Sequence, residues 1–407
     1  MILDRHNKRT LALYLIIMGT LFAVAFNVRD VKAENTIIIW SDGHVSPSGS
    51  PILQDGNFYT LTRDYNGSIS VSRDNAVVDG AGHTLLGSSP GGNLFSGTGI
   101  DVEDTTNTTV KNFVIRKFES GVDVWQQFGA SSSNCVFNSN LTDNKYGVHI
   151  LRSNNNEVRN NSISNNQVGI YIMWATNEHI FDNTITGSII GIQFNLGGGN
   201  FVYHNNMLSN SQQFSEVIAT SNTLDLGYPL GGNYYGSGND YCSGASQNES
   251  GSDGICDHPF VITANETDHY PLMGYYHVYP VNQDLVEIIS NSTTSTVQFN
   301  GSEISFKVTG SSWTFGFCRI AIPKSLLDEP YVILVNGTQV QYTLLPCSNS
   351  THNYIFFTYH HSTEQITIAH TAIPEFPSSL MLVVLMISIM LAVTVCRVKS
   401  AKFLEHE

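Results

Sequence analysis

A step of glycine followed by alternating apolar residues repeats through the middle of the chain. Each step has the order Gly-apolar-X-apolar, and successive glycines are 22, 26, 22 and 22 residues apart. The five steps begin at Gly99, Gly121, Gly147, Gly169 and Gly191. A unit of this length cannot bury its apolar face until neighbouring units stack on it, so the repeat predicts a solenoid.

A second apolar marker follows eleven residues after the glycine in each full-length unit, at Val110, Val158, Ile180 and Val202. In the Gly121 unit the marker is Val136, fifteen residues on, which indicates an insertion of four. Three residues after the markers stand Phe113, Ser139, Asn161, Asn183 and Asn205. Asn tolerates the left-handed backbone of tight corners, and stacked amides can hydrogen-bond from coil to coil. These features predict a parallel β-helix. An Asn-rich β-sandwich is the alternative, and it does not explain a fixed register over five units.

The stretch Asn75–Leu85 and the repeats resemble the right-handed β-helix proteins of the NosD-like family and the related carbohydrate-binding and sugar-hydrolase repeats. Closing runs at Gly231–Tyr235, Ser252–Phe260 and Asp268–Leu272 carry the same resemblance, which covers residues 55–273. The resemblance implies a right-handed β-helix and is specific for fold rather than for function. The family name is attached to copper delivery for nitrous-oxide reduction, so the resemblance also implies copper binding as one possible function.

Two apolar runs near the ends of the chain predict membrane signals. Basic residues at positions 5–9 precede an apolar run from Leu11 to Phe26, which is typical of a secretory signal peptide or an uncleaved anchor. An uncharged run from Ser378 to Val395 is followed by basic residues at 397–402. This second run predicts a transmembrane helix with a cytoplasmic tail.

Residues 275–372 contain short alternating runs and the hairpin signal Asn336-Gly337, which predict a small immunoglobulin-like β-sandwich. The motifs Gly316–Cys318, Ile322–Lys324 and Tyr359–Thr363 resemble a module of archaeal surface proteins. The spacer Pro374–Pro377 resembles the carboxy-terminal anchors of such proteins.

The expected fold is all-β: a right-handed parallel β-helix, then a small immunoglobulin-like β-sandwich, then a C-terminal transmembrane helix. The expected parts are a signal peptide or anchor (1–33), an N-terminal cap with the first coils (34–98), the β-helix repeats (99–230), a closing loop segment (231–274), the β-sandwich (275–372), a spacer (373–379), the transmembrane helix (380–396) and a cytoplasmic tail (397–407).

The composition is acidic and poor in charged residues. Lys and Arg total 19 against 34 Asp and Glu, giving a net charge of −15, which argues against a nucleic-acid partner. The spacing of the cysteines predicts two disulfides, Cys242–Cys256 and Cys318–Cys347, in an oxidising compartment. Ten Asn-X-Ser/Thr sequons favour surface glycosylation. They begin at Asn66, Asn107, Asn140, Asn160, Asn248, Asn265, Asn291, Asn300, Asn336 and Asn349.

Alternation within the Gly-apolar-X-apolar strand places every second side chain in solvent. Stacked coils then form one outward column of Asp101, Asp123, His149, Tyr171 and Gln193, and a second of Glu103, Trp125, Leu151, Met173 and Asn195. Arg152 and Trp174 follow at the strand ends. Aromatic rings cover the apolar face of a sugar while carboxylates and amides bind its hydroxyls, so these columns favour an extended polysaccharide as ligand. The predicted substrate-binding residues are Asp101, Glu103, Asp123, Trp125, His149, Tyr171, Trp174 and Gln193.

Catalysis is an alternative to binding on this surface. Asp101 and Asp123 stand on adjacent rungs, glycoside hydrolysis uses two carboxylates, and His149 lies one rung further as an acid or base. A lyase usually needs Ca²⁺ and a basic residue, for which Arg152 is the nearby candidate. No catalytic set is firm, and a non-catalytic protein is favoured.

Two kinds of metal site are weighed. Asp240, Asp253 and Asp257 in a Gly-rich loop are compatible with Ca²⁺, or they cap turns of a disulfide-tied loop. Copper requires clustered His, Met or Cys, whereas His149, His179, His204, Met173 and Met207 fall on different strands. The expectation is no resident cofactor, with Ca²⁺ as the alternative.

The sequence therefore predicts a single-pass cell-membrane protein with an extracellular body and a cytoplasmic C-terminus. Its expected partners are a polysaccharide or glycan and, through the C-terminal helix, the membrane. A polysaccharide hydrolase or lyase, a structural surface stalk and a NosD-like copper accessory protein are the alternatives.

Overall fold

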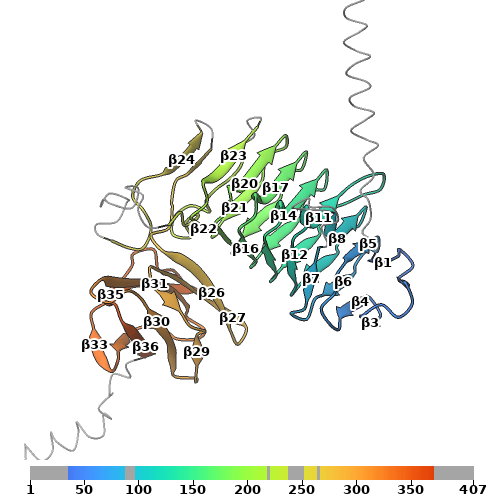
Figure 1. The fold of residues 1–407 in the computed structure, drawn as a ribbon. Coiled ribbons are helices and arrows are strands. Elements are labelled where there is room, and N and C mark those ends of the chain that lie inside the picture. Colours follow the sequence, from blue (N-terminus) through green and yellow to red (C-terminus); the bar gives the residue numbers. More distant parts are fainter. Residues whose placement is uncertain (1–34, 88–96, 218–220, 237–251, 264–265, 371–407) are drawn as a thin grey trace, which may run out of the picture. The chain divides into compact units, whose positions relative to one another are not determined.

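The structure is a computed structural model that describes residues 35–87, 97–217, 221–236, 252–263 and 266–370. Within these ranges all regular elements are β-strands (Figure 1), and no helix there is long and apolar enough to cross a membrane. The predicted signal peptide, spacer, transmembrane helix and tail lie outside the described residues. The chain divides into two compact units. The first unit comprises the chain up to Val278 and the segment Ile288–Asn291. The second unit comprises the segment Tyr279–Glu287 and the chain from Ser292 onward.

The first unit is a parallel β-solenoid, which confirms the predicted β-helix. Each coil contributes one strand to each of three sheets, and equivalent strands of successive coils pair in parallel (Figure 1). Sheet A has nine strands in the order β2 (Val45–Ser46), β1 (Thr36–Ile39), β5 (Ser68–Val71), β8 (Thr98–Glu103), β11 (Ser120–Trp125), β14 (Tyr146–Leu151), β17 (Val168–Met173), β20 (Ile190–Asn195) and β23 (Gln212–Glu216). β2 is the antiparallel exception at the N-terminal end.

Sheet B has eight strands, namely β21 (Phe201–Tyr203), β18 (His179–Phe181), β15 (Glu157–Arg159), β12 (Cys135–Phe137), β9 (Thr109–Lys111), β6 (Val77–Asp79), β4 (Phe58–Leu61) and β3 (Ile52–Asp55). Sheet C has six, namely β22 (Asn206–Leu208), β19 (Thr184–Thr186), β16 (Ser162–Ser164), β13 (Asn140–Thr142), β10 (Val114–Arg116) and β7 (Thr84–Leu86). A short antiparallel pair, β24 (Phe260–Thr263) and β25 (Glu266–Asp268), follows the coils.

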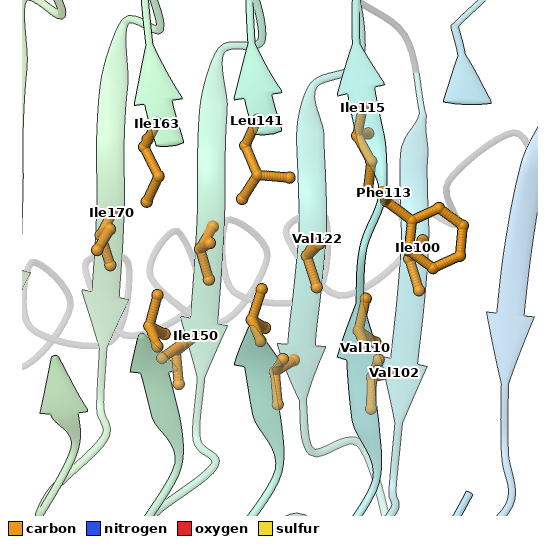
Figure 2. Close-up of a cluster of buried hydrophobic side chains, with 14 of the residues drawn as sticks. Ile100, Val102, Val110, Phe113, Ile115, Val122, Leu141, Ile150, Ile163 and Ile170 are labelled. Carbon is orange, nitrogen blue, oxygen red and sulfur yellow. The ribbon is translucent and has the colours of Figure 1, made fainter. Parts of the chain in front are cut away.

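Apolar side chains from the three sheets meet inside the coils and form one continuous core (Figure 2). The column Ile100, Val122, Val148, Ile170 and Ile192 is fully buried, and so is the column of markers that includes Val110, Ile180 and Val202. Val136 pairs with Val110 in sheet B, so the four-residue insertion is accommodated in the loop after β11. Asp104, which follows β8 in the preceding coil, accepts the backbone N–H groups of Gln127 and Phe128 of that loop at 2.7 and 3.0 Å.

The repeated glycine is explained by close approach of neighbouring coils. A Cβ added to Gly147 would lie 2.5 Å from the carbonyl oxygen of Gly169 and 2.8 Å from Cγ2 of Ile163. The backbone oxygen cannot move without disturbing the sheet.

We expect Gly147→Ala to lower the free energy of unfolding by about 2 kcal/mol, the usual cost of overpacking. Urea unfolding would measure the loss, and Ser162→Ala, at an exposed position of β16, is the control that should change little.

Buried polar side chains form three ladders along the solenoid, as the Asn-rich corners predicted. In each ladder, a side-chain oxygen accepts a hydrogen bond from the backbone N–H of the equivalent residue one coil earlier. For example, Asn161 Oδ1 accepts the Ser139 N–H at 2.9 Å, and Asn183 Oδ1 accepts the Asn161 N–H at 3.0 Å. The members are Ser139, Asn161, Asn183, Asn205 and Asn233 in the first ladder, Asn134, Asn156, Glu178, Asn200 and Asn222 in the second, and Asn144, Asn166, Ser188 and Asn210 in the third. The ladders satisfy backbone groups at corners where no strand pairs with them.

Two of the ladders end on acidic residues of β25. Asp268 accepts the Asn233 N–H at 2.7 Å and the Tyr235 O–H at 3.0 Å. Glu266 accepts the Asn222 N–H at 3.0 Å. The segment after the coils thus supplies the last acceptors of the solenoid.

The second unit is built on two sheets, whose strands support the predicted β-sandwich in part. One has the order β26 (Tyr275–Val281), β27 (Asp284–Ser290), β31 (Phe315–Pro323), β35 (His352–His360) and β34 (Thr343–Leu344). The other has the order β28 (Thr293–Thr294), β30 (Glu303–Thr309), β36 (Thr363–His370), β32 (Tyr331–Val335) and β33 (Thr338–Val340), with β29 (Gln298–Phe299) on β30. Asn336-Gly337 joins β32 to β33 as the predicted hairpin.

The predicted Cys318–Cys347 disulfide is wrong, because both residues are thiols. Cys318 is buried with Sγ 3.6 Å from the Tyr359 hydroxyl, whereas the next residue of β31, Arg319, contacts the Cys347 sulfur at 3.8 Å. Successive residues of a strand point to opposite faces, so the two sulfurs lie on opposite sides of β31. Cys256 is disulfide-bonded, as expected, and its predicted partner Cys242 lies outside the described residues.

Candidate ligand-binding face

The outward columns predicted on sheet A are present, and we call them, together with Arg152 and Trp174 at the strand ends, face A. Asp101, Asp123, His149, Tyr171 and Gln193 pair rung by rung, and so do Glu103, Trp125, Leu151, Met173 and Asn195. All ten lie on strands whose alternate residues are buried in the core, so their side chains point away from it. The structure therefore brings together the predicted binding residues of both columns.

The two aspartates of face A have different partners. Asp101 Oδ1 accepts the Trp125 indole N–H at 2.7 Å. Asp123 Oδ1 lies 3.1 Å from His149 Nδ1, and both side chains are about six-sevenths buried, with 16% and 15% exposed. One carboxylate thus orients an aromatic ring and the other orients an imidazole.

His149 lies within a stack of aromatic rings. Its ring centroid is 5.4 Å from that of Tyr146 and 5.2 Å from that of Tyr171, with interplanar angles of 28° and 9°. Burial alone would lower the pKa of His149, but the Asp123 carboxylate beside it raises that pKa above its ordinary value. The Asp123 carboxylate thus stabilises the charged form of the imidazole against the effect of burial.

Sequence reasoning missed Tyr146, Lys145 and Glu119. Tyr146 stacks on both His149 and Tyr171, and Lys145 lies 4.8 Å from the centre of the Tyr146 ring and 2.6 Å from Glu119. Strand alternation did not reveal it, because Tyr146 and His149 are three residues apart, whereas in β14 the two successive residues Gly147 and Val148 are both buried, which leaves Tyr146 on the same side as His149.

The stacking corrects one expectation about the rings. Tyr146, His149 and Tyr171 cover one another's faces, so these rings present mainly their edges to a ligand. Trp174 differs, since it is 41% exposed and has the Arg152 guanidinium 4.9 Å from its ring centre. Trp174 adopts a left-handed φ of 52°, as do Arg152 and Leu196 at the same corner of the neighbouring coils, so this conformation belongs to the repeated corner. The Tyr171 hydroxyl accepts the Asn195 amide at 2.8 Å.

The histidines and methionines weighed for copper do not converge. His149 is on sheet A, and His179 is on sheet B, where it stacks on Phe201. His204 is buried with Nε2 3.0 Å from the Leu230 carbonyl, and burial lowers its pKa to about 4. Met207 is fully buried in the core. Across the described ranges no three His, Cys, Asp or Glu residues are grouped as metal ligands, so these residues do not fit a copper centre.

Of the three aspartates considered as Ca²⁺ ligands, the structure describes two. Asp253 is buried, and its Oδ1 accepts the Ile255 N–H at 2.9 Å, which is the turn-capping role given as the alternative. Asp257 is partly exposed, and Asp240 lies outside the described residues.

Residues 33–241 match the sequence model of the family described as periplasmic copper-binding protein (NosD). The match covers just over half of the chain and coincides with the solenoid. The chain belongs to the NosD family. No curated protein matches this NosD-family chain closely enough to count as a relative. The copper in the family description concerns the family, and the described residues of this NosD member offer no matching donor set.

Proposed function

We propose that this NosD-family protein binds an extended polysaccharide or glycan along face A, without cleaving it. The proposal is supported above all by the arrangement at the C-terminal half of the face, where Trp174 is half exposed beside the Arg152 guanidinium and next to the hydrogen-bonded pair Tyr171 and Asn195. An exposed indole flanked by a cation, a hydroxyl and an amide fits a sugar ring, because its apolar face can cover the indole while its hydroxyls bind the polar groups.

Rigid support of these side chains adds to the proposal. Trp125 is held by Asp101, and the exposed Phe128 stands in a loop anchored by Asp104 beside the strand end. Side chains that are fixed before binding lose less entropy on binding a ligand. We further propose that the body is extracellular and that residues 380–396 anchor it in the cell membrane, as the apolar run and its basic flank indicate.

The test is a glycan-array screen of the full chain in a mild detergent, followed by calorimetry on any polysaccharide that binds. We expect Trp174→Ala to weaken affinity about three- to tenfold, the loss of one aromatic contact. Trp125→Ala should also weaken it. The control is Phe181→Ala, because Phe181 is also an outward aromatic residue of the solenoid but stacks on Tyr203 and lies on sheet B.

Other outcomes separate the alternatives. Equal affinity of wild type and Trp174→Ala would contradict binding on face A. Release of oligosaccharide that stops in Asp123→Asn would favour a hydrolase or lyase. Absence of any glycan ligand would favour a structural stalk, and stoichiometric copper binding would favour the accessory role.

A further inference from the structure

The last strand of sheet A carries an acidic residue at a core position. Glu216 of β23 pairs with Phe194 of β20, and Phe194 continues the buried column of Ile150 and Ile172. Strand alternation therefore directs the Glu216 side chain toward the end of the core. Its Oε1 is buried and accepts no hydrogen bond.

A second carboxyl group meets Glu216 there from β25. Glu266 is 1% exposed, and its Oε1 accepts both the N–H and the amide of Asn222, which ends the second ladder. Its Oε2 is buried without a hydrogen-bond partner. Burial, together with the adjacent Glu216 carboxyl, raises the pKa of Glu266 to about 8.

The other charged groups at this end are already engaged. Asp268 accepts hydrogen bonds from Asn233, Tyr235 and Tyr270. Asp225, on the segment before, lies 3.0 Å from the His269 imidazole. The charged group that acts directly on Glu266 is therefore Glu216.

Two carboxylates in a water-poor site repel each other, and neither is stabilised by solvent. A proton between them removes one charge and gives each oxygen a hydrogen-bonding partner. We propose that Glu216 and Glu266 hold one shared proton, and that this carboxyl pair is a pH-sensitive lock fastening β25 to the last coil. Loss of the proton places two charges at the end of the core, which releases β25 from the last coil.

Hydrogen exchange measured by mass spectrometry on the full chain at pH 6.5 and pH 9, corrected for intrinsic exchange, tests the lock. We expect the peptide covering residues 266–270 to lose protection roughly tenfold or more between pH 6.5 and pH 9, because each pH unit between the open-state pKa and the closed-state pKa of about 8 favours the open form tenfold, and the loss levels off above that closed-state pKa. Glu216→Gln keeps the shape and supplies an N–H donor, so it should retain protection at both pH values.

The matched control is Glu178→Gln, which removes a buried acid three rungs away in the same ladder. Its 266–270 peptide should still lose protection at pH 9. Equal loss in wild type and Glu216→Gln would overturn the shared proton. Restored protection at pH 9 in millimolar Ca²⁺, seen in wild type but not in Glu216→Gln, would also overturn it, since the pair would then be a cation site.

Discussion

Replacing Asn183 by Leu should lower the free energy of unfolding by about 4 kcal/mol, because buried backbone groups would lose their partners. Asn183 is fully buried. Its Oδ1 accepts the Asn161 N–H at 3.0 Å, and its Nδ2 donates to the Val158 carbonyl at 2.7 Å and to Asn205 Oδ1 at 2.9 Å. Leucine has a similar branched shape but makes none of these bonds, so unsatisfied groups remain in the core. Chemical denaturation followed by circular dichroism would measure the loss.

The control for this ladder is the corner residue Asn177. Its amide donates to Asn155 at 2.6 Å, but both residues are at the surface, and Asn177 has a φ of 61°. Glycine adopts that conformation readily, so Asn177→Gly should change stability by less than about 1 kcal/mol. Equal losses in Asn177→Gly and Asn183→Leu would contradict the view that burial of the ladder is what stabilises the coils.

Raising the pH from about 5 to 8 should destabilise the wild-type solenoid through Glu178. Burial raises the pKa of Glu178 from 4.5 to about 8, although hydrogen bonds from Asn156 oppose the shift. The folded chain therefore keeps a proton that the unfolded chain releases above its own pKa. Stability from this group is full below pH 4.5 and declines until pH 8, by up to roughly 4 kcal/mol.

Glu178→Gln should remove this pH dependence. Glutamine keeps the oxygen that accepts the Asn156 N–H and replaces the other carboxyl oxygen, Oε1, which is buried without a hydrogen-bond partner. The measurement is the free energy of unfolding at pH 5, 6.5 and 8 for both proteins. Glu157→Gln, which changes a half-exposed acid paired with Arg159, is the control. Parallel pH profiles for wild type and Glu178→Gln would show that Glu178 is ionised in the folded protein.

The outward columns were predictable because strand alternation and a fixed coil period place residues that are 22 or 26 positions apart on adjacent rungs. Asp123 and His149 illustrate this, since the Gly-apolar-X-apolar step alone aligned them and the structure pairs them at 3.1 Å. The orientation of the rings was not predictable. Whether Tyr171 presents its face or its edge depends on the rings of neighbouring coils, and the period carries no information about side-chain rotamers.

The sequence by itself determined the solenoid, its core columns, its Asn ladders and the composition of face A, because each follows from residues that repeat at one short period. Only the tertiary structure decided how positions without that period meet. Glu216 and Glu266 come together because β25 returns to the end of the core after the coils stop. Cys318 and Cys347 stay apart because β31 lies between them, which the spacing of two cysteines along the chain does not encode.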